Sequence, residues 1–542
     1  MSRPHQDRLR LLSPDQEADV DRVVTDLLTG VSAGVPADLV DDIAKVREQC
    51  RLGAERIPGA GVMLDGFAAW PLFGGPHPLV VLPAGLDPKG WKMYSGAIVR
   101  LLMRGYAVVA YTERGLPGSE GELTVAGPED VADGIAVIDW ALDHDRLDVD
   151  RDRVGMMGIS YGSGISQLVA AADDRVGAVV ALSTWADLGE ALYDNGTRHL
   201  MAVEALAAIS EHPSADLLRV LADFRANENI GEVLEWAAPR SPARVSQRRV
   251  PTFFTSYWHE TIFPQNQLLD HFDRYQGDKR LDLAIGDHGA VEIPGLTLGV
   301  HTRTTEAAYD WLDHHLRGVD NGIDRDGLVH IETMHNFAKE AAADLKSWIR
   351  PSRRYYLEAP EAGSTDGVLT ELSTSGYGQS IQVGDAQVRA ASTLVFDGFL
   401  ERLLMPKRQR LAEVDRRAAA VWSTEGFREP QRVAGIPELQ VTVTPSEDEV
   451  TVIAYLFDLQ PFTGALTIIT HAAVTVDDAV AGEPAPVHIR LQATDYRIRA
   501  GHKLVLIVDT RDPLYGEDNT DGSTITLSDH HGAAFVDVPL SS

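Results

Sequence analysis

Residues 154–172 read VGMMGISYGSGISQLVAAA, and this stretch decides the fold. Its start, residues 154–157, is a short apolar run typical of a buried parallel strand, and residues 162–172 favour a helix. The turn between them carries the pattern G-x-S-x-G with Ser160 at its centre. A sharp turn from strand to helix crowds the flanking positions, so they must be small, and it lifts the serine oxygen clear of the sheet. We therefore predict that Ser160 is a nucleophile; the alternative is an incidental serine in a glycine-rich turn.

Short apolar runs and helical stretches alternate on both sides of this turn. Such alternation indicates βαβ units, in which helices cover both faces of a parallel sheet. We therefore predict an α/β fold for this part of the chain. The strand candidates are residues 79–82, 107–111, 154–157, 178–182, 252–257 and 281–285, and the helix candidates are residues 94–104, 129–143 and 162–172.

Three further regions depart from this alternation. Residues 13–57 combine apolar and acidic residues at spacings near three and four, which favours two short helices. Residues 187–249 hold helical stretches with no strand between them, which indicates an inserted helical cap. Beyond residue 322 the apolar period falls toward two and turns become frequent, which is typical of an all-β jelly-roll sandwich. We expect a helical N-terminal extension (1–60), an α/β-hydrolase domain with the cap (61–322) and a β-sandwich (323–542).

The composition limits the partners of this protein. Its 542 residues contain 49 Lys and Arg against 80 Asp and Glu, which gives a net charge of −31. Such a surface repels nucleic acid and anionic lipid, so we expect neither as a partner. No apolar run approaches the length of a spanning helix and the N-terminus lacks a signal-peptide core, so we expect a soluble, cytoplasmic protein. The only cysteine, Cys50, can form no internal disulfide. A homodimer is one alternative for the oligomeric state.

A serine nucleophile needs a base and an acid that orients the base. In α/β-hydrolases these follow the serine in the order acid, then histidine, on turns after later strands. Two turns qualify, one after residues 252–257 and one after residues 281–285. We therefore assign Glu260 as the orienting acid and His288 as the general base.

Each assignment has rivals. His259 is a second candidate for the base, although it precedes the acid and would reverse the expected order. We expect Asp287 to be a solvated or structural carboxylate, because a residue adjacent to His288 points its side chain away in most geometries. Three histidines near or on the last helix of the α/β domain are expected at the surface: His301, His314 and His315.

Metal and cofactor motifs fit this sequence poorly. His259-Glu260 begins like the zinc motif H-E-x-x-H, but Phe263 occupies the position of the second histidine. Residues 517–522 are rich in oxygen ligands but lack the distal Glu of an EF-hand loop, so we expect a polar β-hairpin there. We find neither a P-loop nor a G-x-G-x-x-G motif after the first strand. We therefore expect no metal and no organic cofactor.

Shorter motifs follow one another along most of the chain, from about Asp65 to the end. They are residues 65–66 (DG), 104–109 (RGYAVV), 112–115 (TERG), 119–121 (SEG), 158–162 (GISYG), 250–252 (VPT) with Trp258, 286–289 (GDHG), 311–318 (WLDHHLRG), 320–322 (DNG) and 500–504 (AGHKL). Each motif alone is a moderate signal, and their order makes a chance match improbable. With these motifs the chain resembles the cocaine esterase and X-prolyl dipeptidyl aminopeptidase family, often called CocE/NonD hydrolases.

The resemblance implies hydrolysis of an ester or amide through an acyl-enzyme, with Ser160, Glu260 and His288 matching the family's nucleophile, acid and base. The chain departs from the family twice: Glu260 stands where the family usually has Asp, and the loop at residues 82–87 (LPAGLD) lacks the tyrosine that helps form the oxyanion hole in cocaine esterase-like members. We expect the backbone N–H of Tyr161 as one oxyanion donor. The second donor is predicted to be the N–H of Gly85 or Leu86.

Aromatic residues near strand ends and the cap could form a pocket for the substrate, a small ester or amide. The candidates are Trp91, Tyr161, Trp185, Tyr257, Trp258 and Phe263. A peptidase that removes a dipeptide or aminoacyl group would also need carboxylates to hold the free amine, and the cap offers Glu190, Asp194, Glu204 and Glu211. Acyl transfer or cyclisation on the same three residues, and a binding protein without catalysis, are further alternatives.

Overall fold

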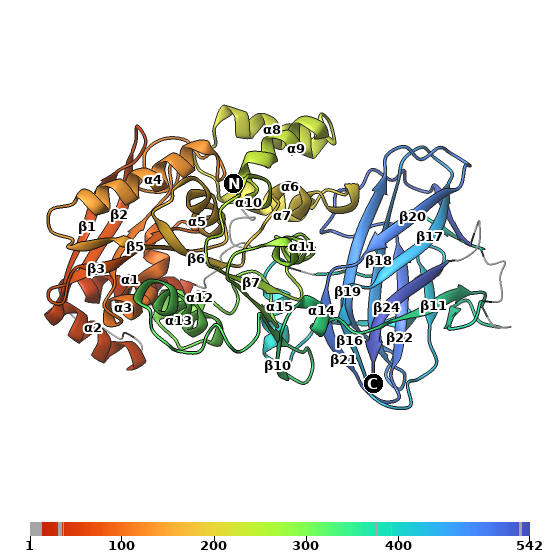
Figure 1. The fold of residues 1–542 in the computed structure, drawn as a ribbon. Coiled ribbons are helices and arrows are strands. Elements are labelled where there is room, and N and C mark those ends of the chain that lie inside the picture. The colour runs from red at the N-terminus through yellow and green to blue at the C-terminus, as the bar shows by residue number, and fades with distance from the viewer. Residues whose placement is uncertain are drawn as a thin grey trace.

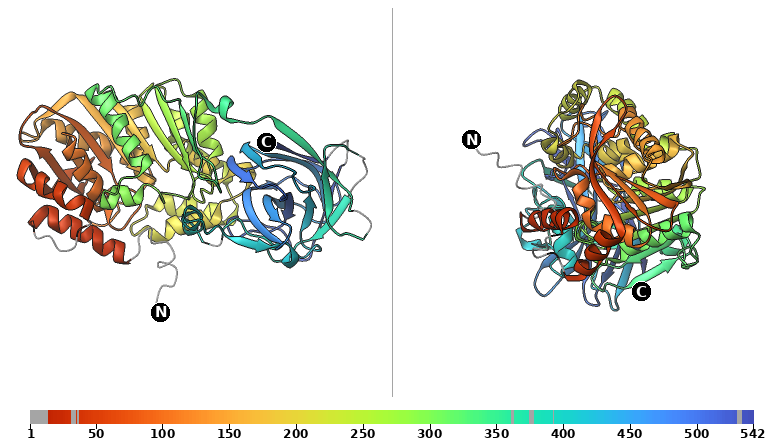
Figure 2. Two further views of the ribbon diagram at one scale, coloured as in Figure 1. Left: turned by 90° about the horizontal axis from the view of Figure 1, so that it is seen from below. Right: turned by 90° about the vertical axis from the view of Figure 1, so that its left-hand side faces the viewer.

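The protein has an α/β half and an all-β half, which lie side by side (Figures 1 and 2). The computed structural model describes residues 14–30, 35, 37–360, 363–373, 378–391, 393–529 and 534–542. Within this part of the chain, no helix is long and apolar enough to cross a membrane. The fold class predicted from the sequence is confirmed.

A ten-stranded sheet forms the centre of the α/β half. Its seven middle strands are parallel, in the order β4-β3-β5-β6-β7-β8-β9, and antiparallel strands flank them at both edges. Two predicted strands match their bounds, and the others differ by a few residues at the ends. The strands are β1 (Cys50–Pro58), β2 (Met63–Pro71), β3 (His77–Pro83), β4 (Ala107–Tyr111), β5 (Val149–Ile159), β6 (Val176–Leu182), β7 (Thr252–Tyr257), β8 (Lys279–Ala284), β9 (Val329–Glu332) and β10 (Lys339–Ala342).

Helices cover both faces of this sheet because its parallel strands are apolar on both sides. On one face, apolar residues of the first three helices and of α13 pack together, and on the other face those of α4, α5 and α11 do so. The helices are α1 (Pro14–Thr29), α2 (Ala37–Gln49), α3 (Ser95–Met103), α4 (Pro128–Asp143), α5 (Tyr161–Ala172), α11 (Asn266–Arg274), α12 (Ile293–Leu298) and α13 (Arg303–Arg317).

The structure differs from the expected organisation at both ends of the α/β half. Two N-terminal helices form as predicted, but the residues after them form β1, which pairs with β2 over its full length. Its alternating exposure is that of an edge strand, a pattern that a short sequence window does not separate from a half-exposed helix. At the other end, β9 and β10 lie beyond residue 322 and still belong to the first sheet. Residues 1–13 of the expected extension lie outside the described residues.

The predicted cap consists of helices between β6 and β7, with no strand among them. The cap helices are α6 (Leu188–Leu192), α7 (Leu200–Ile209), α8 (Ala215–Ala226), α9 (Ile230–Ala237) and α10 (Pro242–Val245). In Figure 1, α6 and α7 lie between the α/β half and the all-β half, and α8 and α9 form the outer layer. Val203, Val220, Phe224 and Val233 form a separate apolar cluster of the cap.

In the described part of the C-terminal half, fourteen strands form the sheet, with further helices at α14 (Leu345–Trp348) and α15 (Phe396–Arg402). Residues 517–522 were expected to form a hairpin; this prediction is wrong, because they connect β22 to β23 and these strands do not pair. The strands are β11 (Ser352–Glu358), β12 (Gly367–Thr370), β13 (Gly378–Gln382), β14 (Arg408–Arg410), β15 (Ala420–Ser423), β16 (Gln431–Gly435), β17 (Glu438–Pro445), β18 (Val450–Gln460), β19 (Ala465–Val476), β20 (Ala485–Arg490), β21 (Thr494–Ile498), β22 (Lys503–Asp509), β23 (Thr524–Ser528) and β24 (Phe535–Ser541).

Close backbone packing between α3 and α12 allows a test of this fold. A Cβ atom at Gly96 would collide with the backbone of Gly299, which cannot move aside like a side chain, so Gly96→Ala is expected to destabilise the protein by about 1–3 kcal/mol. Gly231 in α9 has open space around it, so Gly231→Ala is the matched control and should leave stability unchanged or raised. The measurement is the midpoint of the first thermal unfolding transition. An equal midpoint for both variants would contradict the close packing.

Candidate active site

Ser160 lies in a strained turn between β5 and α5. Its backbone has φ 53° and ψ −121°, a conformation that is costly for a residue with a side chain. The flanking glycines are needed because a Cβ atom at Gly158 would collide with the backbone of Gly162, and one at Gly162 would collide with the carbonyl of Pro83. The turn predicted from G-x-S-x-G is therefore present, and it separates the serine side chain from the strand that precedes it.

The structure brings Ser160, His288 and Glu260 together in one chain of hydrogen bonds. His288 Nε2 lies 2.7 Å from Ser160 Oγ, and His288 Nδ1 lies 2.9 Å from Glu260 Oε1. Glu260 follows β7 and His288 follows β8, as predicted, and both are buried. Glu260 Oε1 also accepts the backbone N–H groups of Ile262 and Phe263, at 3.1 and 3.2 Å. These bonds hold the carboxylate toward the imidazole, and the longer side chain of Glu still reaches it.

The surroundings of His288 favour its protonated form. Burial alone would lower the pKa of this imidazole, but the charge and hydrogen bond of Glu260, with smaller contributions from Asp287 and Glu292, together outweigh burial. The pKa of His288 therefore lies above its ordinary value. A neutral imidazole with a raised pKa is a stronger base toward the Ser160 hydroxyl, and its cation is stabilised once it has taken the proton.

Asp287 ties together the loops that carry the acid and the base. Its carboxylate accepts the backbone N–H groups of His288, Thr261 and Val395 and the hydroxyl of Thr261, at 2.7–3.0 Å. It is fully buried, and burial together with Glu260 raises its pKa to about 7. The prediction of a structural carboxylate is thus confirmed, and the alternative of a solvated one is wrong. Val395 lies in the C-terminal half, so that half also contacts this network.

The rival histidines lie in other environments. His259 Nδ1 pairs with Glu401 at 2.7 Å, and no described contact joins it to Ser160. His301 is exposed as expected, and it pairs with Glu306. His314 and His315 are half-buried rather than at the surface; the ring of His315 packs on Trp311, which lies one helical turn earlier in α13.

Of the two backbone N–H groups predicted as the second oxyanion donor, one already donates a hydrogen bond to another residue. The N–H of Gly85 donates to Met93 Sδ at 3.1 Å, so it does not face Ser160 as a free donor. Within the described residues, no group accepts the N–H of Leu86, and Leu86 lies beside Ser160 in the wall of the adjoining pocket. Tyr161 is the first residue of α5, where backbone N–H groups have no partner within the helix. Leu86 and Tyr161 are therefore the available donors.

Two pockets meet at Ser160. The larger extends from Ser160 into the cap and spans about 950 Å³, a volume that includes open solvent. Tyr161, Trp185 and Phe263 line it, as predicted for these aromatics. The smaller is bounded by Gly85, His288, Gly289 and the segment Leu394–Val395. Sequence reasoning missed the apolar cap residues, because apolar residues at helical spacing predict a packed core as readily as a pocket wall.

Three predicted pocket aromatics lie elsewhere, and these predictions are wrong. Trp91 stacks on Phe67 and donates its Nε1–H to Asp65 at 2.9 Å. Trp258 stacks on Trp348 and donates its Nε1–H to the carbonyl of Glu332. Tyr257 is buried in a small cluster with Ala284 and Val291. Tyr257 ends β7 and Trp258 follows it, whereas Trp91 lies in a short 3-10 helix (Gly90–Tyr94) beyond β3. All three side chains are buried, a placement that position in the sequence does not fix.

The site contains no cluster typical of a metal centre. Among the described residues, no group of three or more His, Cys, Asp and Glu side chains could hold a metal ion. The chemistry that the described arrangement itself supports is nucleophilic attack by an activated serine.

Comparisons with known proteins agree with this geometry. Residues 71–290 match the X-Pro dipeptidyl-peptidase (S15) family, and residues 321–536 match the C-terminal non-catalytic domain of X-Pro dipeptidyl-peptidases. A putative Xaa-Pro dipeptidyl-peptidase from Streptomyces avermitilis is 23% identical over 390 residues, which cover 66% of this chain but only about half (53%) of the relative. Cocaine esterase from a Rhodococcus species is 23% identical over 511 residues, which cover 81% of this chain and 86% of that enzyme.

The fold agrees as well. A CocE/NonD family hydrolase from Staphylococcus aureus superposes with a TM-score of 0.68 at 13% identity, over 95% of this chain and all of that one. The two family matches cover the α/β half and the all-β half in turn, and the two relatives align with 66% and 81% of this chain. The chain belongs to the CocE/NonD hydrolases, a family of serine hydrolases that includes X-Pro dipeptidyl-peptidases.

Proposed function

We propose that this protein hydrolyses carboxylic esters through an acyl-enzyme on Ser160. The hydrogen-bonded sequence Ser160–His288–Glu260 carries the proposal, because it supplies a nucleophile, a base and the acid that orients the base. In the first half-reaction Ser160 Oγ attacks the acyl carbonyl carbon while His288 Nε2 takes the hydroxyl proton. Glu260 holds the Nδ1–H and stabilises the imidazolium that forms.

The N–H groups of Tyr161 and Leu86 are the proposed donors to the oxyanion. The N–H of Leu86 takes the place of the tyrosine hydroxyl of cocaine esterase-like relatives, because this loop has no such tyrosine. The intermediate collapses when His288 returns the proton to the leaving alcohol, and the C–O bond of the ester breaks. Water then attacks the acyl-enzyme by the same route, and the acid is released.

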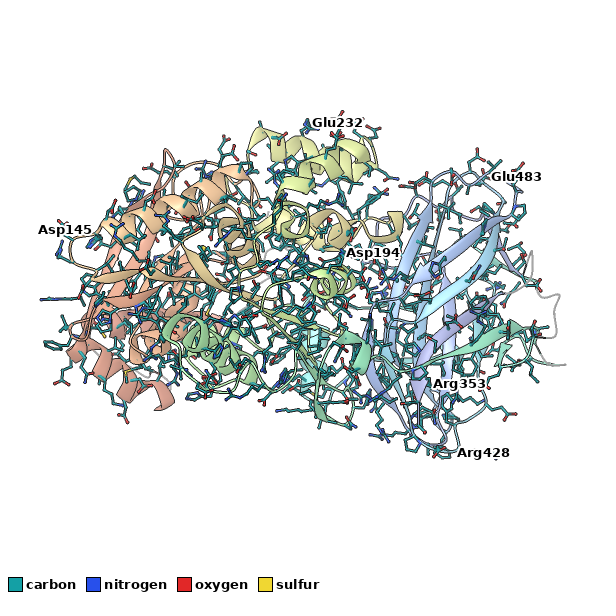
Figure 3. All side chains as sticks on the ribbon, in the orientation of Figure 1. Asp145, Asp194, Glu232, Arg353, Arg428 and Glu483 are labelled. Carbon is teal, nitrogen blue, oxygen red and sulfur yellow. The ribbon has the colours of Figure 1, made fainter. Side chains whose placement is uncertain are left out.

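The peptidase alternative is favoured by the family match but has little support in the pocket. A dipeptidyl-peptidase must hold the ammonium group of its substrate, and burying a charge without a partner is costly. None of the four candidate carboxylates of the cap lines either pocket. Glu190, Glu204 and Glu211 are exposed, and Asp194 accepts the side-chain amide of Gln492 at the boundary between cap and sandwich, where Figure 3 labels it.

Replacement of the nucleophile tests the proposed function. Ser160→Ala is expected to lose fluorophosphonate labelling and to lower kcat/KM for p-nitrophenyl acetate by roughly 10⁴-fold or more, because the acyl-enzyme can no longer form. Ser347→Ala, at an exposed helix cap in the C-terminal half, is the control and should label like the wild type. Absence of labelling in the folded wild type would instead support the binding-protein alternative.

The pH dependence of kcat/KM tests the roles of His288 and Glu260. Activity requires neutral His288, so it should fall toward acid pH with a midpoint above the ordinary histidine value of 6.5. Glu260→Gln removes the charge that raises the pKa of His288, so the midpoint should move to lower pH and the plateau should drop roughly 10³-fold or more.

The chain offers a matched control for this experiment. Glu401→Gln removes the carboxylate from another His–Glu pair, that of the partly buried His259, and should leave the midpoint in place. If Glu401→Gln shifted the midpoint and Glu260→Gln did not, the base would be His259 and not His288.

A pair of anilides separates esterase from dipeptidyl-peptidase specificity. Because the larger pocket offers no partner for an ammonium group, N-acetyl-Ala-Pro-p-nitroanilide should be hydrolysed at least as fast as Ala-Pro-p-nitroanilide, whatever the absolute rate. The measurement is kcat/KM for both compounds, with p-nitrophenyl acetate as the reference substrate. Preference for the free amine by 100-fold or more would establish the peptidase.

A further inference from the structure

The larger pocket at Ser160 continues into the interior of the helical cap. Four cap helices contribute to its wall: Gly189 of α6, Leu206 of α7, Leu217 and Val220 of α8, and Val233 of α9. Ser160 lies in the same wall. The space is thus a pocket whose inner part is surrounded by cap helices and whose other end is the proposed nucleophile.

The wall of this cavity carries no charge. Among the described residues that line it, none is Asp, Glu, Lys, Arg or His. The polar atoms of two lining residues are bound elsewhere: Trp236 Nε1 donates to Asp216, and Ser210 Oγ donates to the carbonyl of Leu206. Any group that enters the cap therefore meets an apolar surface.

The charged residues of the same helices lie on the outside of the cap. Arg225 pairs with Glu204, and Arg219 pairs with Asp223 and Glu232; Figure 3 labels Glu232 at the outer edge of the cap. The helices thus turn apolar faces inward, as helices around a core do. Protein cores are normally filled at crystal-like density, so an uncharged, apolar space that reaches the proposed nucleophile favours a ligand site over ordinary packing.

The position of His288 determines which part of an ester enters the cap. His288 and Gly289 line the smaller pocket and not the larger one, and the ring of Phe263 packs edge-on against His288 with centroids 5.3 Å apart. His288 must return its proton to the leaving oxygen, so the leaving alcohol lies on its side, in the smaller pocket. The acyl group then extends in the other direction, into the cap.

We propose that the cap cavity is a binding site for the acyl chain, and that the substrates are esters of neutral, apolar acids with a chain longer than acetyl. This inference rests on the proposed function. Ser160 becomes acylated by the apolar acid as the alcohol leaves with the proton from His288, and water then releases the free acid. Chain length is selected by apolar contact inside the cap, and charged acyl groups are excluded by the cost of leaving water.

A series of p-nitrophenyl esters with adjacent variants in α8 tests this proposal. For the wild type, kcat/KM is expected to rise at least tenfold from acetate to octanoate. Leu217 is buried in the wall of the cavity, so Leu217→Trp should lower the octanoate-to-acetate ratio of kcat/KM at least tenfold. Leu218 is the next residue in α8, is 52% exposed and does not line the cavity, so Leu218→Trp should leave the ratio unchanged.

A second variant keeps the test decisive if Leu217→Trp does not fold. Ala207→Phe, in the wall formed by α7, narrows the same cavity and should lower the same ratio. A flat chain-length series, or a ratio that stays unchanged in both cavity variants, would overturn the acyl site.

The two proposals fail in different ways. If Ser160→Ala abolishes acetate hydrolysis while the series is flat, the esterase stands and the acyl site is overturned. If Ser160→Ala retains acetate hydrolysis, the proposed function fails and the acyl site is overturned with it.

Discussion

The strained backbone at Ser160 is the constraint on which the rest of the site depends. A positive φ at a residue with a side chain persists only where its surroundings hold it, and here β5, α5 and the carbonyl of Pro83 enclose the turn. The two glycines have no Cβ, which lets the backbones approach this closely. Because the turn is fixed by backbone contacts, Ser160 Oγ is held within 2.7 Å of His288 before any substrate binds. Preorganisation of this kind lowers the barrier without reorganisation during the reaction.

The second support of the site is a buried carboxylate that is not itself in the hydrogen-bonded triad. Asp287 binds the loop of Glu260 through Thr261, the loop of the base through the N–H of His288, and the C-terminal half through Val395. The all-β half therefore does more than cover the hydrolase. Its segment Leu394–Val395 also forms part of the wall of the smaller pocket, next to His288. The conformation of the base thus depends on contacts from both halves of the chain.

Topology explains which residues could be predicted from the sequence. Parallel strands end at the same edge of a sheet, so a serine after β5, an acid after β7 and a histidine after β8 must approach one another, and Ser160, Glu260 and His288 do so. Side-chain direction is different: Trp258 directly follows β7 and Trp91 lies in a short helix beyond β3, yet both rings are buried, and Asp65 and the carbonyl of Glu332 accept their N–H groups. The N–H of Gly85 donates to Met93 Sδ, a contact between residues eight apart that no sequence motif predicts.

The helical spacing of apolar residues in the cap does not predict the cavity inside it. Apolar residues at helical spacing predict that one face turns inward, but they do not say whether the space inside is filled by side chains or left for a ligand. In this chain a net charge of −31 is spread over the protein, while the cavity wall beside Ser160 is uncharged. The charges lie outside this wall, and the neutral cavity selects by desolvation and volume. Such a site discriminates by the free energy of desolvation: a polar acyl group loses its hydration on entering, and the wall has no charged group to compensate for that loss.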